Sequence, residues 1–282
     1  MNNNNQRMPG KRKIFFNSVE QNTEMSEAFR TIRTNLSFLN EKEMGRKLVF
    51  TSSIPGEGKT SVASNYAASL AIAGRKTLLI DCDIRRPRAI ASFGLEVHKG
   101  LESILKKEAE IEEVIVEDVI DNLDILPAKY LNENVTELFL GDGLTELLHK
   151  VENKYNTIIL DTAPLTVASD AAILSKYVDG VVVIVAYDLV AEKELKFTKE
   201  MLTNAGANVY GFIVNRVDST GLSYGNYGYY NNNYSYYKEY YKEDGVKKVH
   251  KVHKGKFGKI LSRFKDEYKQ QFTGDLKERR KK

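Results

Sequence analysis

An octapeptide near the start of the chain has the residues and spacing of a phosphate-binding loop. Its glycines allow backbone N–H groups to close around phosphate oxygens, and the N-terminus of a following helix adds partial positive charge. The lysine can reach the terminal phosphates and the threonine hydroxyl can ligate Mg²⁺. A serine stands where the usual pattern begins with glycine. The residues expected to bind a nucleotide here are Ser53, Pro55, Gly56, Glu57, Gly58, Lys59, Thr60 and Ser61.

Three carboxylates follow two apolar runs farther along the chain. Asp81 ends the run 78–81, Asp83 lies two residues beyond it, and Asp161 ends the run 158–161. The carboxyl ends of parallel strands face the crevice where ligands bind, so these side chains are expected beside the loop. Oxygen ligands suit Mg²⁺, usually through water, whereas a single such aspartate would favour a helix cap or a turn. The predicted metal ligands are Thr60, Asp81, Asp83 and Asp161.

The elements that must position these residues alternate between strands and helices. The run Val181–Val185 shows no alternation of polar and apolar residues, so both faces of that strand should be buried, as in parallel sheets covered by helices on both sides. The sequence therefore predicts an α/β fold with an open, doubly wound, mostly parallel sheet. Strands are predicted at 47–52, 76–82, 124–126, 157–160, 180–186 and 209–215, and helices at 24–40, 59–73, 101–107, 135–150, 169–176 and 191–204.

The two ends of the chain differ in composition from its middle. We predict a disordered segment at 1–19, a folded domain at 20–221 that includes the first helix, a tyrosine-rich tail at 222–244 and a basic extension at 245–282. The tail holds nine tyrosines among glycines and asparagines with almost no aliphatic residues, so it cannot bury a core. It is expected to be mobile.

The charge and the cysteine content limit the kinds of protein this can be. The extension 245–282 holds 14 Lys and Arg against 4 Asp and Glu, which suits anionic lipid, nucleic acid, an acidic partner or a merely solvated end. A lone cysteine, Cys82, excludes an intramolecular disulfide. There is no run of 18 apolar residues and the first residues lack the apolar core of a signal peptide, so a cytoplasmic location is expected.

Four motifs in this order resemble those of the bacterial tyrosine kinases. Besides the phosphate-binding loop, residues 81–85 read Asp-x-Asp-x-Arg, similar to the family's second Walker motif, and residues 161–164 read Asp-Thr-Ala-Pro, similar to the third. Residues 27–33 read Glu-x-x-Arg-x-x-Arg, which resembles the oligomerisation motif, and the tyrosine cluster completes the set. The resemblance covers about residues 20–241 and implies a P-loop fold like that of MinD and ParA.

The resemblance implies an ATP-dependent protein-tyrosine kinase in which Lys59 and Thr60 bind ATP and Mg²⁺. It assigns Asp83 and Asp161 to the metal and its waters, and Asp81 to the base that faces the substrate tyrosine. An ordinary Asp has a pKa of about 4 and a Tyr of about 10, so complete proton transfer before reaction would cost roughly 8 kcal/mol. Either the base accepts the proton late, or Mg²⁺ and a nearby arginine lower the pKa of the tyrosine.

The acceptors in this interpretation are the tail tyrosines, and a twenty-residue extended tether spans at most about 70 Å, enough to reach a neighbouring subunit. The resemblance makes Glu27, Arg30 and Arg33 a contact between subunits of a ring, although their spacing also allows a weak surface salt bridge. Asn215 and Arg216 resemble the adenine-contacting pair of related ATPases. The predicted acceptors are Tyr224, Tyr227, Tyr229, Tyr230, Tyr234, Tyr236, Tyr237, Tyr240 and Tyr241.

The family also implies partners for the chain. They are a membrane adaptor that activates the kinase and recruits it to the inner face of the plasma membrane, a cognate phosphatase, and a role in capsule or exopolysaccharide production. In the family the tyrosine cluster usually ends the chain, whereas here the basic extension follows it, with anionic lipid or the adaptor as candidate partners. Nucleic acid is not expected as a partner.

The alternative is an ATPase of the same superfamily without kinase activity, acting as a switch in the manner of MinD or ParA. It would share the phosphate-binding loop and the Asp-ended strands. Such proteins typically carry an extra lysine near the start of the loop, where this chain has Ser53 and Ile54. They also have no use for nine clustered tyrosines.

Overall fold

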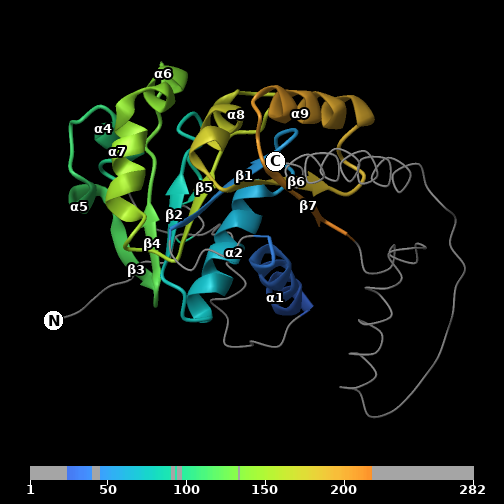
Figure 1. Cartoon of the computed structure of the whole chain (residues 1–282), viewed down its shortest axis with the longest axis horizontal. Coiled ribbons are helices and arrows are strands. Elements are labelled where there is room, and N and C mark those ends of the chain that lie inside the picture. The colour runs from blue at the N-terminus through green and yellow to red at the C-terminus, as the bar shows by residue number, and fades with distance from the viewer. Residues whose placement is uncertain (1–23, 40–44, 90–92, 94–96, 133, 218–282) are drawn as a thin grey trace, which may run out of the picture. The chain divides into compact units, whose positions relative to one another are not determined.

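A computed structural model of the chain describes residues 24–39, 45–89, 93, 97–132 and 134–217. The chain divides into two compact units, with the boundary after Asn215. The first unit contains every helix and strand given below (Figure 1). The segment predicted at 1–19, the tyrosine-rich tail and the basic extension lie outside the described residues, so the domain boundaries predicted at 19, 221 and 244 stay predictions.

A seven-stranded sheet with the order β3-β4-β2-β5-β1-β6-β7 forms the centre of the first unit. Neighbouring strands pair in parallel, except that β3 runs antiparallel to β4 at one edge. The predicted mostly parallel α/β sheet is therefore confirmed. The strands are β1 (Arg46–Ser52), β2 (Thr77–Asp81), β3 (Val116–Ile120), β4 (Leu123–Leu126), β5 (Thr157–Asp161), β6 (Gly180–Ala186) and β7 (Val209–Asn215).

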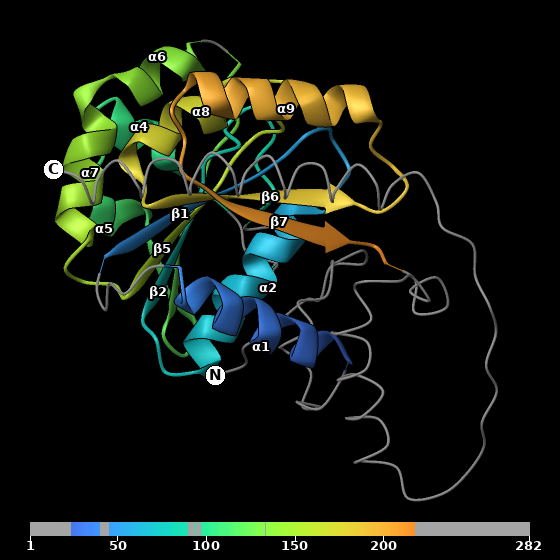
Figure 2. The same cartoon turned by 45° about the vertical axis from the view of Figure 1, so that its right-hand side comes forward.

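Helices cover both faces of this sheet. Figure 2 shows α1 and α2 on one face and α8 and α9 on the other, which is the doubly wound arrangement. All seven residues of β6 are buried, as the unbroken apolar run predicted. The helices are α1 (Glu24–Ser37), α2 (Lys59–Ile72), α4 (Leu101–Leu105), α5 (Ile111–Val114), α6 (Val135–Leu140), α7 (Asp142–Val151), α8 (Asp170–Leu174) and α9 (Glu192–Asn204), with a 3₁₀ turn, η2, at Ser175–Tyr177.

The structure corrects the prediction at three places. The single helix expected at 135–150 is two helices, α6 and α7, because Gly141 between them takes an extended backbone with φ −78° and ψ 168°. The edge strand β3 was not predicted, since its sequence VEDVI has no clear apolar run and its residues are partly or fully exposed. The short helix α5 was also missed. Of these elements, α6 contacts a functional motif, because Arg85 donates to Thr136 at its start.

Helix α1 is fastened to the rest of the unit by two arginines. Arg33 donates to the carbonyl oxygen of Ser69 on α2 at 2.6 Å, and the buried Arg46 of β1 donates to the carbonyl oxygen of Leu36 at 2.8 Å. These bonds satisfy carbonyl groups near the C-terminal ends of two helices, where no intrahelical donor is available for the last turn. The apolar side chain of Phe29 completes the contact by joining the core.

Candidate nucleotide-binding and catalytic site

The register of three adjacent strands brings the functional motifs together. Asp81 at the end of β2 is paired with Asp161 at the end of β5, and Asp161 is also paired with Phe50 of β1. Strand β1 continues through Ser52 into the phosphate-binding loop. Because all three strands are parallel, their carboxyl ends lie at one edge of the sheet, which is where an open α/β sheet binds ligands.

The loop has the backbone that a phosphate cradle requires. Gly56 and Gly58 have φ of +90° and +88°, conformations that side-chain-bearing residues rarely adopt. Ser53 does not use a positive φ, so a glycine is not needed at this position. Its buried hydroxyl instead accepts a hydrogen bond from the hydroxyl of Thr198 on α9 at 2.9 Å. The serine at this position therefore connects the loop to α9, a helix that lies 145 residues away in the sequence.

The side chain of Glu57 holds the loop from beneath rather than facing a ligand. One carboxylate oxygen accepts the N–H of Ile54 at 2.8 Å, and the other accepts the N–H of Ala186 at the end of β6 at 3.0 Å. The carbonyl oxygen of Glu57 accepts the side-chain amide of Asn215 at 2.8 Å. The sequence predicted Glu57 as a nucleotide contact and did not foresee that its side chain anchors the loop.

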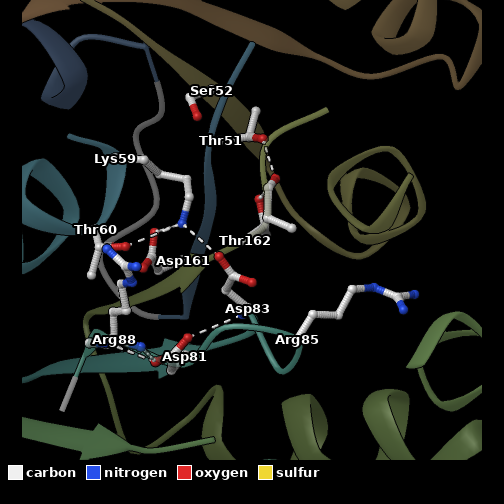
Figure 3. Close-up of polar contacts among 12 residues, drawn as sticks. Thr51, Ser52, Lys59, Thr60, Asp81, Asp83, Arg85, Arg88, Asp161 and Thr162 are labelled. Atoms are coloured by element: carbon white, nitrogen blue, oxygen red, sulfur yellow. Dashed lines mark hydrogen bonds and ion pairs between the residues drawn. The ribbon is translucent and has the colours of Figure 1, made fainter. Parts of the chain in front are cut away.

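Lys59 lies among the carboxylates, as Figure 3 shows. Its ammonium nitrogen is 2.8 Å from Asp161 Oδ1, 3.7 Å from Asp83 Oδ2 and 3.3 Å from Thr60 Oγ1, and the side chain is 6% exposed. Burial by itself would lower the pKa of Lys59, but the charges of Asp161 and Asp83 outweigh burial and raise it. The lysine therefore stays charged at neutral pH.

Asp81 holds its own loop in place. One carboxylate oxygen accepts the N–H groups of Arg88 at 2.9 Å and Ala89 at 2.8 Å, and the other accepts the N–H of Asp83 at 3.1 Å. Burial, together with the nearby charge of Asp161, raises the pKa of Asp81 to about 7. Folding therefore favours the protonated form, so the contribution of this group to stability is complete below about pH 4 and is lost as the pH rises through about 7.

Arg85, the last residue of the second motif, turns away from the lysine. Its Nε lies 3.7 Å from Asp170 Oδ2 at the start of α8, and its Nη2 donates to Thr136 Oγ1 of α6 at 3.2 Å. Asp170 is fully buried, and burial raises its pKa against the opposing charge of Arg85. Sequence reasoning did not single out Asp170 or Thr136, because nothing in their local sequence separates them from ordinary helix-start residues.

The residues at this edge fit a nucleotide and a magnesium ion held mainly by water and phosphate. Asp161 Oδ2 is buried and has no hydrogen-bond partner in the described part of the chain, so it can accept from a water of a metal shell. Among the described residues no group of three or more His, Cys, Asp or Glu forms a metal cage. Mg²⁺ rarely uses such cages, because it keeps several waters and takes only one or two carboxylates plus phosphate.

The remaining predicted residues lie elsewhere. Glu27 and Arg30 form an ion pair at 2.5 Å on the surface of α1, with side chains 43% and 38% exposed. Arg33 faces α2, as described above, so the predicted oligomerisation residues are not part of the phosphate site. Arg216 belongs to the second unit and has a positive φ of +58°; its predicted contact with adenine stays a prediction. The nine predicted acceptor tyrosines lie outside the described residues.

Comparison with known proteins decides the family. Residues 45–204 match a family model described as an AAA domain. The chain is 33% identical over 205 residues to the tyrosine-protein kinase YwqD of Bacillus subtilis, which covers 73% of this chain and 86% of that protein. The kinase domain of the Escherichia coli tyrosine kinase ETK matches with a TM-score of 0.66 and 29% identity, covering 78% of this chain and 89% of that one. The chain belongs to the bacterial tyrosine-protein kinases.

The cell division ATPase MinD of Pyrococcus furiosus has the same fold as this kinase. It matches with a TM-score of 0.53 and 26% identity, covering 62% of this chain and 75% of that chain. The predicted P-loop fold is thereby confirmed, while the lower similarity makes the switch ATPase the less favoured alternative. Within the residues that the structure describes, no helix of the kinase has the length and apolarity needed to span a membrane.

The two loop glycines provide a matched pair of substitutions. A methyl group on Gly58 would overlap the side-chain amide of Asn215, whereas one on Gly56 meets no atom within 4 Å. Both substitutions strain a positive φ, but only Gly58→Ala must also break the bond from Asn215 to Glu57, at a cost of roughly 1–3 kcal/mol. We expect Gly58→Ala to weaken ATP binding at least about tenfold more than Gly56→Ala in a titration with a fluorescent nucleotide. Equal losses in the two variants would contradict the proposed role of Asn215.

The raised pKa of Asp81 predicts how the activity of the kinase depends on pH. A base must lose its proton before it can accept one, so the phosphorylation rate should rise as the pH passes through about 7. We expect Asp81→Asn to lower the rate at least about 100-fold and to abolish this rise, with Asp121→Asn in an exposed turn as the control. Near-normal phosphorylation by Asp81→Asn, with intact ATP binding, would remove Asp81 as an essential base.

Proposed function

We propose that this kinase transfers the γ-phosphoryl group of ATP to the tyrosines of its own 222–244 segment, on a neighbouring copy of the chain. The observation that supports this most strongly is the meeting of Lys59, Asp161 and Asp83 at the edge of the sheet, with the base candidate Asp81 paired in register to Asp161. The nine tyrosines follow the last strand of that sheet within about 30 residues, which suits a tethered substrate.

The chemistry asks the protein mainly for positioning and for charge neutralisation. The N–H groups of the loop and the ammonium of Lys59 bind the phosphates, while Thr60, Asp83 and Asp161 would hold the magnesium ion and its waters. When bound, the ion supplies positive charge to the phosphate oxygens. Glu57 holds the loop in place for this task by accepting the N–H of Ala186 at the end of β6.

Asp81 is better suited to accept the tyrosine proton than an ordinary aspartate. The raised pKa of Asp81 reduces the difference between its pKa and that of an ordinary tyrosine. The cost of complete proton transfer therefore falls from roughly 8 to roughly 4 kcal/mol. A barrier contribution of this size is compatible with enzymatic rates, which supports Asp81 as the base. The other hypothesis, in which Mg²⁺ and a nearby arginine lower the pKa of the tyrosine, needs no change in the pKa of Asp81.

The family resemblance supports further proposals about assembly and partners. We propose a ring of kinase subunits, a membrane adaptor that recruits and activates it at the inner face of the plasma membrane, a cognate phosphatase, and a role in capsule or exopolysaccharide production. The net positive charge of 245–282 supports contact with anionic lipid. Sedimentation with anionic vesicles tests that contact; equal sedimentation of the whole chain and of a chain ending at residue 244 would contradict it.

Phosphotyrosine formation in purified protein tests the kinase proposal. With ATP and Mg²⁺ the chain should react with an anti-phosphotyrosine antibody, and Lys59→Met should not, because the lysine is the main protein charge on the terminal phosphates. A mixture of Lys59→Met with a wild-type chain shortened after residue 221 should show phosphate on the full-length variant, which establishes transfer between chains. ATP hydrolysis by the wild type without any phosphotyrosine would instead support a switch ATPase.

The surface pair on α1 allows a test of the ring. Arg30→Glu reverses an exposed charge whose pair within the chain is worth at most about 1 kcal/mol, so a large effect must come from contact with another subunit. We expect this variant to lower the oligomer mass in light scattering and to slow phosphorylation, while Lys150→Glu, which loses a comparable exposed pair with Glu110, changes neither. The wild-type oligomer should also loosen after phosphorylation, because the added charges repel one another. An unchanged mass for Arg30→Glu would argue against a ring built on this helix.

A further inference from the structure

The phosphate site carries more negative than positive charge. Lys59 lies against the carboxylates of Asp83 and Asp161, and Asp81 is paired in register with Asp161. A triphosphate adds more negative charge than one Mg²⁺ offsets. Binding of the terminal phosphate therefore calls for a further cation close to the loop, since charge in a partly buried site is weakly screened.

Three arginines follow the strand that carries Asp81, and they differ in where they lie. Arg85 is held by Asp170 and Thr136 and points away from Lys59 in Figure 3. Arg86 is exposed to solvent. The side chain of Arg88, in contrast, is partly buried and extends toward Thr60 at the start of α2 in the same view.

The position of Arg88 is fixed by the carboxylate of Asp81. The N–H groups of Arg88 and of the next residue, Ala89, both donate to one oxygen of Asp81, at 2.9 and 2.8 Å. Because its backbone is held by Asp81 and its side chain extends toward the loop, Arg88 is well placed to bind a phosphate.

We propose that Arg88 is a further phosphate-binding residue of this kinase, whose guanidinium binds the γ-phosphate of ATP from the side opposite the loop. Arginine suits this task because its planar fork of donors matches two phosphate oxygens at once. The inference rests on the proposed function for its catalytic meaning, since charge placed on the transferring group stabilises the transition state of phosphoryl transfer. Its effect on nucleotide binding is independent of which acceptor is phosphorylated.

Separate titrations with ATP and with ADP test this proposal, because only ATP has a γ-phosphate. We expect Arg88→Ala to weaken ATP binding in the presence of Mg²⁺ by about 10- to 100-fold and ADP binding by much less. Arg88→Lys should recover part of the loss. Arg86→Ala, which removes the same charge from an exposed neighbour, should leave both affinities unchanged.

Three results would overturn the proposal. Equal losses of ATP and ADP affinity would mean that Arg88 only supports the loop, and unchanged ATP affinity with a raised KM for an acceptor peptide would mean that it binds the acceptor. The same ATP-specific loss in Arg86→Ala would reduce the effect to net charge. If Arg88→Ala does not fold, as judged by its thermal melting, Arg88→Gln keeps the length without the charge. ATP-selective loss in a protein that forms no phosphotyrosine would refute the proposed function and leave the phosphate contact standing.

Discussion

The buried ion pair between Lys59 and Asp161 is the interaction on which the rest of the site depends. Removing two charges from water is costly, and the attraction across 2.8 Å repays that cost only while both partners are present. Loss of Lys59 would leave the buried carboxylate of Asp161 without its cation, and loss of Asp161 would leave Lys59 with Asp83 alone, at 3.7 Å. The pair thus keeps a lysine charged in a buried place where an unpartnered lysine would tend to release its proton.

Around this pair, side chains hold the backbone of the phosphate loop in place. Glu57 and Asn215 connect the loop to the ends of β6 and β7, and Ser53 connects it to α9. Asp81 likewise fixes the segment that carries Asp83, by accepting the N–H of Asp83. Donors and charges held in this way need little reorganisation when a transition state forms, which is the main source of catalysis in phosphoryl transfer.

The same arrangement explains why related proteins can use one fold for different ends. The cell division ATPase MinD has the same fold as this kinase. In this chain a tyrosine-rich segment and a basic extension follow β7 in the sequence. Fold similarity therefore establishes the architecture, whereas the kinase assignment depends on the close relatives and on the residues at the site.

Much of this could be predicted from the sequence because its signals are local. Glycine spacing between a strand and a helix specified the loop, unbroken apolar runs specified the buried strands, and an aspartate at the end of such a run marked the ligand-binding edge. The break between α6 and α7 at Gly141 was missed because one glycine inside a helical pattern does not show whether the helix continues.

Tertiary structure alone decided which way the side chains face. Whether Glu57 meets a nucleotide or turns beneath the loop depends on the N–H of Ala186, which lies 129 residues away in the chain. The opposite directions of Arg85 and Arg88, three residues apart, likewise depend on Asp170 and on Asp81. Sequence determines the kind of residue and its local backbone, but the partners that orient a side chain and shift its pKa come from strands and helices that only folding brings together.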